Sequence, residues 1–210
     1  MLVFAAVLVF VASVARAGDP PMPPKEAPAY SGVYKASNKS KAMATDDWQF
    51  QTEDTITMAV LNKQSRWEFK SDGRTIITDS VSRFTTQFGG KLPPNVATRS
   101  QSTFTPIGWE FGMATVAAAT PVKPQILGTT TIAGHECTRV QFVSTQFGKP
   151  EFCVTKNGIT LRFANASSTA EAVYEAVSID EAAPAPDRFT VPAGYKVEER
   201  AGAPKRELKF

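Results

Sequence analysis

The sequence contains few of the residue types that build metal and cofactor sites. Its 210 residues include one histidine and two cysteines. These numbers exclude a site with several histidine ligands and a four-cysteine zinc or iron–sulfur site. The sequence also has no G-x-S-x-G, H-E-x-x-H or glycine-rich phosphate-binding motif. We therefore expect no metal, no cofactor and no enzymatic activity.

An excess of charge of one sign is also missing. The chain has 23 basic and 20 acidic residues, a balance too close to neutral for a general nucleic-acid-binding surface. Hydrophobic residues make up 42% of the chain, which is enough to build the core of one domain.

The N-terminus carries a targeting pattern. Residues 2–14 form an unbroken apolar stretch, and Ala15-Arg16-Ala17 has the small-x-small pattern of a signal-peptidase site. The stretch is shorter than the roughly 20 apolar residues that a permanent membrane helix needs. We predict a signal peptide over residues 1–17 and a periplasmic product with no stable membrane span after cleavage. An N-terminal core helix or strand is the alternative.

The rest of the chain divides by composition. Residues 18–29 contain five prolines, which is typical of an extended linker. Residues 30–197 are predicted to form a single β domain. The charged residues 198–210 are predicted to form a flexible tail.

Apolar and polar residues alternate with a period of two through much of this domain. Trp67 and Phe69 fall on one face of a predicted strand over residues 65–70, and charged residues fall on the other. Residues 137–142 and 159–164 show the same alternation. Turn sequences separate the predicted strands: Asp72-Gly73, Gly89-Gly90, Ala133-Gly134 and Asn157-Gly158. The pattern predicts a mainly β fold with an antiparallel sheet that curls or closes.

The two cysteines fall in consecutive predicted strands. A hairpin centred near Thr145 places Cys137 directly opposite Cys153, at a distance that a disulfide can bridge. We predict a structural disulfide, with two free thiols or a redox pair as the alternatives.

The same hairpin assigns side chains to the two faces of the sheet. Phe152 and Val154 join Val140 and Phe142 on the apolar face, and both sulfur atoms lie on the opposite face.

The single histidine, His135, is the only candidate for a conventional general base. It lies in Gly134-His135-Glu136, where a turn enters a strand. We interpret it as an exposed turn residue. The alternative is a hydrolase that pairs His135 with a serine or cysteine nucleophile.

Three segments carry a family resemblance. Residues 127–140 (LGTTTIAGHECTRV) resemble the G-x-E-T-I-A-G-x-x-C-x-K/R-Y signature of small secreted bacterial proteins of the DUF4412 type, which are grouped with the LolA-like periplasmic superfamily. Residues 65–69 (SRWEF) are similar to the R-x-R-M-E-M strand of that group. Residues 188–195 (RFTVPAGY) are similar to its closing F-x-V-P-x-G-Y motif.

The resemblance implies a half-open antiparallel β-barrel or strongly curved sheet of the LolA and LppX kind, with a short helix or loop as a lid. The Ala-rich residues 113–120 are the candidate for this lid, and an edge strand or plain loop is the alternative. In the best-known relatives the concave face carries the acyl chains of lipoproteins across the periplasm. The implied partners are therefore lipid or lipoprotein acyl chains, bound by a monomer.

Large apolar side chains define the candidate ligand-binding face. Burying each one stabilises the protein by about 1.5–3 kcal/mol, so a lid, a ligand or the protein's own core should cover them. We expect a non-enzymatic periplasmic binding protein for an apolar or acylated ligand, involved in lipoprotein or lipid handling. The alternative is an envelope structural or protein-interaction module whose concave face is filled by its own side chains. The candidate residues are Trp67, Phe69, Val140, Phe142, Phe152, Val154, Leu161 and Phe163.

Overall fold

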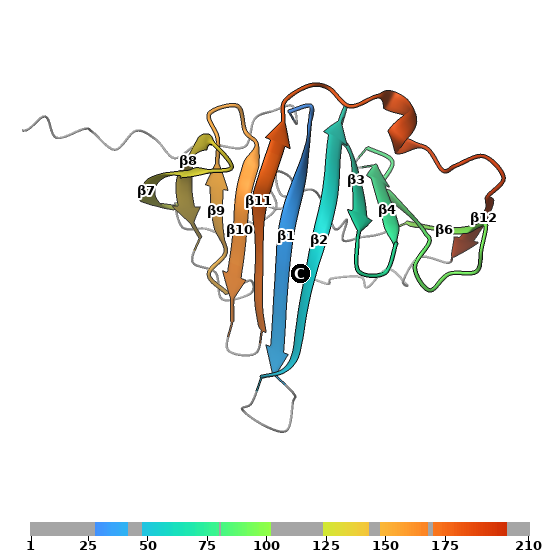
Figure 1. Ribbon diagram of the computed structural model, residues 1–210, viewed down its shortest axis with the longest axis horizontal. Helices are drawn as coiled ribbons and strands as arrows, with labels where there is room; N and C mark the ends of the chain where they lie inside the picture. The colour runs from blue at the N-terminus through green and yellow to red at the C-terminus, as the bar shows by residue number, and fades with distance from the viewer. Residues whose placement is uncertain are drawn as a thin grey trace, which may run out of the picture.

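The computed structural model describes residues 28–41, 48–79, 81–101, 124–142, 148–167 and 170–200. Within them the chain forms twelve strands of one sheet and one short 3-10 helix (Figure 1). No helix in this part of the chain has the length and apolar character needed to cross a membrane. The elements are β1 (Tyr30–Lys41), β2 (Trp48–Leu61), β3 (Gln64–Phe69), β4 (Thr75–Asp79), β5 (Phe84–Phe88), β6 (Val96–Gln101), β7 (Gln125–Ile132), β8 (His135–Gln141), β9 (Glu151–Val154), β10 (Thr160–Ala166), β11 (Ala170–Asp180), η1 (Pro186–Phe189) and β12 (Lys196–Arg200).

Some of the segments predicted from the sequence lie outside these ranges. The signal peptide over residues 1–17, the linker up to residue 27 and the predicted lid over residues 113–120 lie outside the described ranges.

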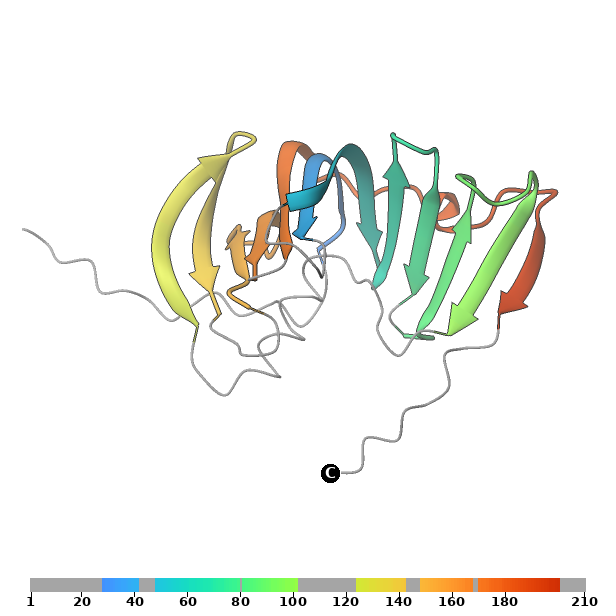
Figure 2. The ribbon, with the colours of Figure 1, turned by 90° about the horizontal axis from the view of Figure 1, so that it is seen from below.

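The sheet consists of two runs of consecutive strands joined at its centre by β1. The strand order is β12-β6-β5-β4-β3-β2-β1-β11-β10-β9-β8-β7. Every pairing is antiparallel except that of β12 with β6, which is parallel. The sheet arches, and its edge strands β7 and β12 stand at the two ends of the arch without closing it (Figure 2). The predicted half-open barrel or strongly curved sheet is confirmed.

Side-chain alternation explains why the central strands form where they do. In β3, Ser65 and Trp67 are buried while the charged residues between and beside them are partly exposed. Trp67 opposes Met58 of β2 and Ile76 of β4, so each strand contributes an apolar residue to the same face.

Tight turns join neighbouring strands. Ala133 and Gly134 connect β7 to β8 with φ values of 50° and 81°. Asn62 and Lys63 connect β2 to β3 with φ values of 49° and 66°. Positive φ at both central residues matches the right-handed twist of a two-residue hairpin. The first of these turns was visible as a glycine turn in the sequence, whereas Asn62-Lys63 was not.

The segment between β11 and β12 runs along the upper ends of the central strands to the β12 edge, and we call it the strap (Figure 1). Val191 and Tyr195 pack against a cluster formed by Ile77, Phe88 and Ala97. The Tyr195 ring meets the Phe88 ring edge to face, with centroids 5.3 Å apart. The strap ends in β12, so residues 198–200, which the sequence assigned to the tail, belong to an edge strand.

Cys137 of β8 and Cys153 of β9 form a disulfide with Cα atoms 5.4 Å apart. The predicted pairing is confirmed, but the predicted register is wrong by two residues. Arg139, not Cys137, opposes Cys153, because Val140 opposes Phe152 in the apolar pair between these strands. The cysteines are therefore diagonal neighbours on one face, and both are buried. A buried disulfide is typical of proteins from oxidising compartments.

Removing this disulfide should destabilise the protein. Cross-linking a loop of about 15 residues stabilises the folded state by roughly 3 kcal/mol in the chain-entropy model. We expect the double variant Cys137→Ala/Cys153→Ala to lose about that much free energy of unfolding, measured by urea denaturation. Reducing the wild-type protein should lower its urea midpoint and leave that of the variant unchanged. Equal midpoints for oxidised and reduced wild type would contradict a stabilising role.

Asp79 organises the turn between β4 and β5. Its Oδ1 accepts the N–H of Val81 at 2.8 Å and the N–H of Ser82 at 3.2 Å. Burial acts to raise the pKa of this carboxyl group, but hydrogen bonds from Ser82, Val81 and Gln64 outweigh burial and lower the pKa below its usual value.

This lowered pKa predicts a pH-dependent contribution to stability. A carboxyl group that binds protons less readily in the folded state stabilises the fold above its unfolded pKa of about 3.9. The contribution disappears as the pH falls through the lower, folded pKa. We expect Asp79→Asn to reduce the free energy of unfolding at pH 7 and to narrow its difference from wild type near pH 3. Urea titrations at both pH values test this, and a difference that does not change with pH would refute it.

Candidate functional site

A row of side chains, mostly apolar, crosses five strands on one face of the sheet, which we call the apolar face. Directly opposed residues of neighbouring strands point to the same face. Val140 of β8 opposes Phe152 of β9, which in turn opposes Phe163 of β10. Phe163 opposes Tyr174 of β11, and Tyr174 opposes Ala36 of β1. The row therefore continues from the C-terminal strands into the first strand.

The aromatic rings of this row contact one another. Phe142, next to the end of β8, meets Phe152 edge to face with centroids 5.8 Å apart. The Phe152 and Phe163 rings are 5.1 Å apart, and the Phe163 and Tyr174 rings are 6.2 Å apart. Phe142 and Phe152 are at most 2% exposed, whereas Phe163 and Tyr174 are half-buried. The row is most deeply buried near β8 and less so near β11.

Trp67 and Phe69 of β3 lie on the apolar face as well. Phe69 opposes Ile56, and Ile56 opposes Tyr34. Tyr34 and Ala36 are alternate residues of β1 and so point to the same face. The Trp67 and Phe69 rings are stacked with centroids 6.5 Å apart. These two side chains extend the face across the centre of the sheet.

Leu161 is fully buried but does not follow the predicted alternation. The pairing of β9 with β10 shifts register between Thr160 and Arg162, so Leu161 lies at a β-bulge. It belongs to a hydrophobic cluster that also contains Cys137 and Cys153, which the sequence placed on the opposite face. Trp67 and Phe69 pack in that same cluster. The remaining predicted residues form a second cluster: Val140, Phe142, Phe152, Val154 and Phe163.

Alternating charges line the opposite face, and we call them the charged ladder (Arg139, Glu151, Arg162 and Glu175). Glu151 Oε1 lies 2.8 Å from Arg139 Nε and 3.1 Å from Arg162 Nη1. Arg162 Nε lies 3.2 Å from Glu175 Oε2. The four residues come from β8, β9, β10 and β11 in that order, so the sign of charge changes at every strand.

Glu151 is the centre of the charged ladder. Its side chain is 12% exposed, the lowest value in the ladder, and it accepts hydrogen bonds from two arginines. Its hydrogen bond and negative charge raise the pKa of the Arg139 guanidinium above its usual value. Sequence analysis missed the ladder, although Arg139 and Arg162 occupy the polar positions of strands whose alternation was recognised.

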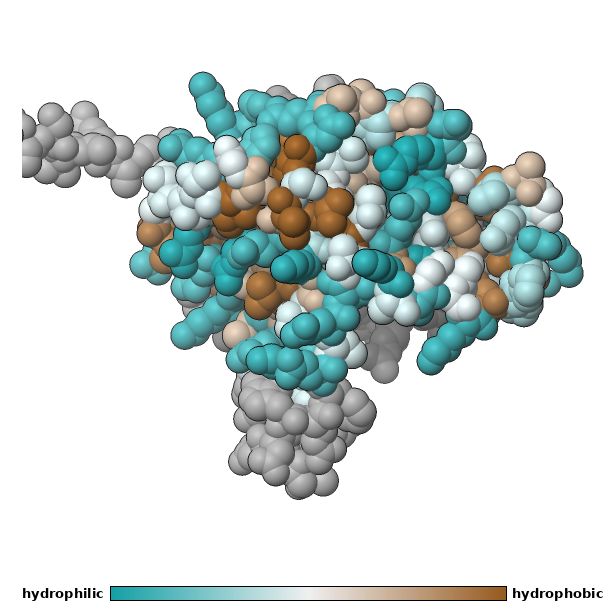
Figure 3. All heavy atoms as spheres, viewed as in Figure 1, coloured by the Kyte–Doolittle hydropathy of each residue, from teal (hydrophilic) through white to brown (hydrophobic). Residues whose placement is uncertain are grey.

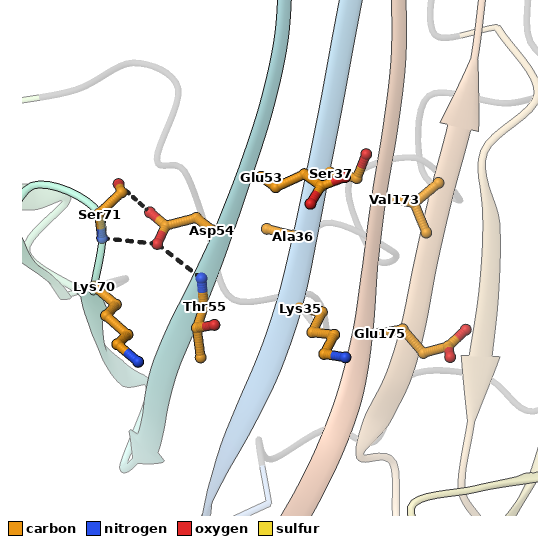
Figure 4. A pocket seen from close by; sticks show the side chains of 10 residues that line it. All are labelled: Lys35, Ala36, Ser37, Glu53, Asp54, Thr55, Lys70, Ser71, Val173 and Glu175. Atoms are coloured by element: carbon orange, nitrogen blue, oxygen red, sulfur yellow. Dashed lines mark hydrogen bonds between the residues drawn. The ribbon is translucent and has the colours of Figure 1, made fainter.

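A depression of about 670 Å³ lies next to the ladder, around β1 and β2 (Figure 4). Lys35, Thr55 and Glu175 line it together with Lys70 and Ser71 of the β3–β4 turn. The space-filling view shows hydrophilic residues over much of this side of the molecule, with hydrophobic patches among them (Figure 3). The lining of the depression combines charged and hydroxyl groups with the apolar side chains of Ala36 and Val173.

Asp54, also at this depression, accepts three hydrogen bonds. It accepts the backbone N–H groups of Thr55 and Ser71 and the Ser71 hydroxyl, at 2.7 to 2.9 Å. These bonds tie the β3–β4 turn to β2, which makes Asp54 a structural residue.

His135 has an acidic partner. Its Nδ1 lies 3.3 Å from Glu181 Oε1, and Asn157 Nδ2 lies 3.4 Å from the other oxygen of Glu181. Within the described residues, His135 is therefore paired with the carboxylate of Glu181 and not with a serine, threonine or cysteine side chain. The arrangement ties the β7–β8 turn to the segment after β11 and does not resemble a nucleophile–base pair. The described residues also contain no group of three or more metal-ligating side chains.

No family model matches the chain, and no curated protein matches it.

Comparison with solved structures finds weak similarities. A conserved uncharacterized protein from Thermus thermophilus aligns over 80% of this chain and 91% of its own length, with 13% identity and a TM-score of 0.49. MucB, in its complex with MucA from Pseudomonas aeruginosa, aligns over 81% of this chain and 58% of its own length, with 12% identity and a TM-score of 0.43. A putative outer membrane lipoprotein-sorting protein domain from Vibrio parahaemolyticus aligns over 78% and 89%, with 8% identity and a TM-score of 0.30. Sequence identities and TM-scores this low do not allow a function to be inferred for this chain.

The geometry of the charged ladder predicts a stabilising role for Glu151. Glu151→Gln keeps the size of the side chain but removes the charge that two arginines share. Hydrogen bonds to charged groups contribute about 1.5–3 kcal/mol each when buried, and this site is partly exposed, so we expect the free energy of unfolding to fall by about 1–2 kcal/mol. Glu199→Gln is the matched control, because Glu199 is 61% exposed and lies 3.7 Å from Arg99. Equal losses in the two variants, measured by urea denaturation, would rule out a special role for Glu151.

Proposed function

We propose that this chain works outside the cytoplasm as a non-enzymatic binding protein whose apolar face, on the inside of the arch, accepts an apolar or acylated ligand. The observation that carries the proposal is the continuous row of side chains from Val140 to Ala36 in a sheet that does not close. Ligand sites of this type are concave and mainly apolar. The buried disulfide and the predicted signal peptide support the extracytoplasmic location.

The half-buried part of the row, at β10 and β11, is the proposed entrance. Phe163 and Tyr174 present aromatic surface there, and the Tyr174 hydroxyl donates a hydrogen bond to Asn38 Oδ1 at 3.3 Å. An aromatic surface with a polar group at its rim suits an acyl chain that ends in a polar head. By the resemblance to LolA-like proteins and the DUF4412 type, the ligand class is lipid or lipoprotein acyl chains, and the cellular role is lipid or lipoprotein handling.

A second function is favoured by a different observation. Val140, Phe142, Phe152 and Val154 are each at most 2% exposed, as in a filled core. If these side chains stay packed, the domain is an envelope structural or protein-interaction module that carries no apolar ligand.

A fluorescent fatty acid distinguishes the two functions. We expect the secreted protein to bind dansyl-labelled undecanoic acid with enhanced, blue-shifted emission and to release it when palmitate is added. Phe163→Asp places a charge at the entrance and should weaken binding by roughly tenfold or more, given the free energy of burying an aromatic side chain. Val177→Asp is the control, because Val177 of β11 is 51% exposed.

Circular dichroism and thermal melts establish that each variant is folded. A folded wild-type protein that neither binds the probe nor carries co-purified lipid would refute the proposal and favour the interaction module. Equal probe binding by Phe163→Asp and Val177→Asp would show that the probe binds elsewhere.

A further inference from the structure

The two edges of the sheet differ in chemistry. β12 carries four charged residues among its five, and all five are exposed. β7 has eight residues, none of them charged and none of them proline, and Thr129, Thr130 and Thr131 are exposed. Charges and prolines on an edge strand discourage the addition of another strand, and an edge without them is a template for one. Within the described residues, no strand pairs with the outer side of β7.

The charged ladder ends at this edge with an arginine that shares its carboxylate with a second arginine. From Glu175 to Arg139 the sign of charge alternates strand by strand. The next position outward, opposite Arg139, is Gly128 of β7, which has no side chain. Arg139 is 41% exposed, and its partner Glu151 is shared with Arg162. If the alternation continued outward, an acidic side chain would stand at the position of Gly128, and a residue reaching in from a strand beyond β7 would supply it.

Gly128 leaves open space at this point. Apart from its two chain neighbours, no described residue has an atom within 4 Å of a Cβ atom placed on Gly128, and the φ of 115° is one that residues with side chains rarely adopt. Two strand spacings separate Arg139 from a residue on an added strand, a distance of about 10 Å. Extended arginine and glutamate side chains together span such a distance across a glycine.

We propose that the outer edge of β7 binds an extended segment of a partner protein as an additional strand, and that an acidic residue of this segment lies over Gly128 and pairs with Arg139. Main-chain hydrogen bonds to β7 supply the affinity, and the charge of Arg139 selects the partner. A second copy of this chain is a poorer occupant, because pairing two β7 edges supplies no acidic residue for either Arg139. The surface is separate from the apolar face, so the proposal does not depend on a bound lipid.

A designed peptide tests whether the charge of Arg139 selects an acidic partner segment. The probe is an acetylated nine-residue peptide of alternating threonine and valine with one central glutamate, and its partner has lysine in place of the glutamate. We expect the glutamate peptide to shift backbone amide signals of β7 and β8 in NMR spectra of the full chain. It should bind about fivefold more tightly than the lysine peptide, the scale of an exposed ion pair. A fully N-methylated glutamate peptide should not bind, because it has no main-chain donors.

Two arginine variants test whether Arg139 causes the preference for the glutamate peptide. Arg139→Gln should remove the preference for glutamate over lysine while both peptides still bind. Arg99→Gln should leave the preference unchanged, because Arg99 is equally exposed at 40% and also lies near a glutamate, but it belongs to β6 at the other end of the sheet.

Three results would overturn the proposal. They are equal binding of the two peptides to the wild-type protein, peptide-induced shifts outside β7 and β8, and concentration-dependent dimerisation through β7 in place of peptide binding. The last result would identify a second copy of this chain as the occupant.

Discussion

The pairing of β1 with β2 on one side and with β11 on the other holds the two halves of the sheet in a common register. Tyr34 opposes both Ile56 and Ala176, and Lys35 opposes both Thr55 and Glu175. Because side chains alternate between faces, a slip of one residue in either pairing would turn one half of the sheet over relative to the other. The continuity of the apolar row and the position of the depression beside the charged ladder both depend on this double pairing.

The register separates two kinds of chemistry that are only one residue apart along each strand. Val140, Phe152 and Phe163 lie on one face, while Arg139, Glu151 and Arg162 lie on the other. The first set packs rings together, and the second set satisfies each buried or half-buried charge with an opposite one. Neither face interferes with the other, so a ligand on the apolar face and a partner at the β7 edge could be bound at the same time.

Much of this arrangement follows from local sequence. The alternation around Trp67 and Phe69 predicted their shared face. The parity of Phe152 against Cys153 placed these two neighbours on opposite faces, and in the structure they belong to different hydrophobic clusters. Turn residues such as Ala133-Gly134 predicted the β7–β8 hairpin. These features depend on neighbours a few residues away, which is why the sequence reveals them.

The features that the sequence did not reveal depend on how distant strands align. The bulge at Leu161 and the register that places Arg139 opposite Cys153 are set by the fit between whole strands. No local sequence pattern records this fit, so the predicted cysteine register was wrong by two residues. To predict the charged ladder, one must know the order of four strands in the sheet as well as the face to which each side chain points. The parallel pairing of β12 with β6 requires the strap, whose Val191 and Tyr195 contacts bring the end of the domain back to the far edge.

The central position of β1 also constrains how the chain can fold. Ser31 pairs with Asp180, so the first strand completes its hydrogen bonding only after nearly the whole domain has been made. Until then β1 has one unpaired side, and the protein contains an additional open edge in its middle. Pairings between residues so far apart in sequence slow folding and prolong the time for which edges are exposed. The side of β1 that faces β11 is therefore the last part of the centre of the sheet to be paired.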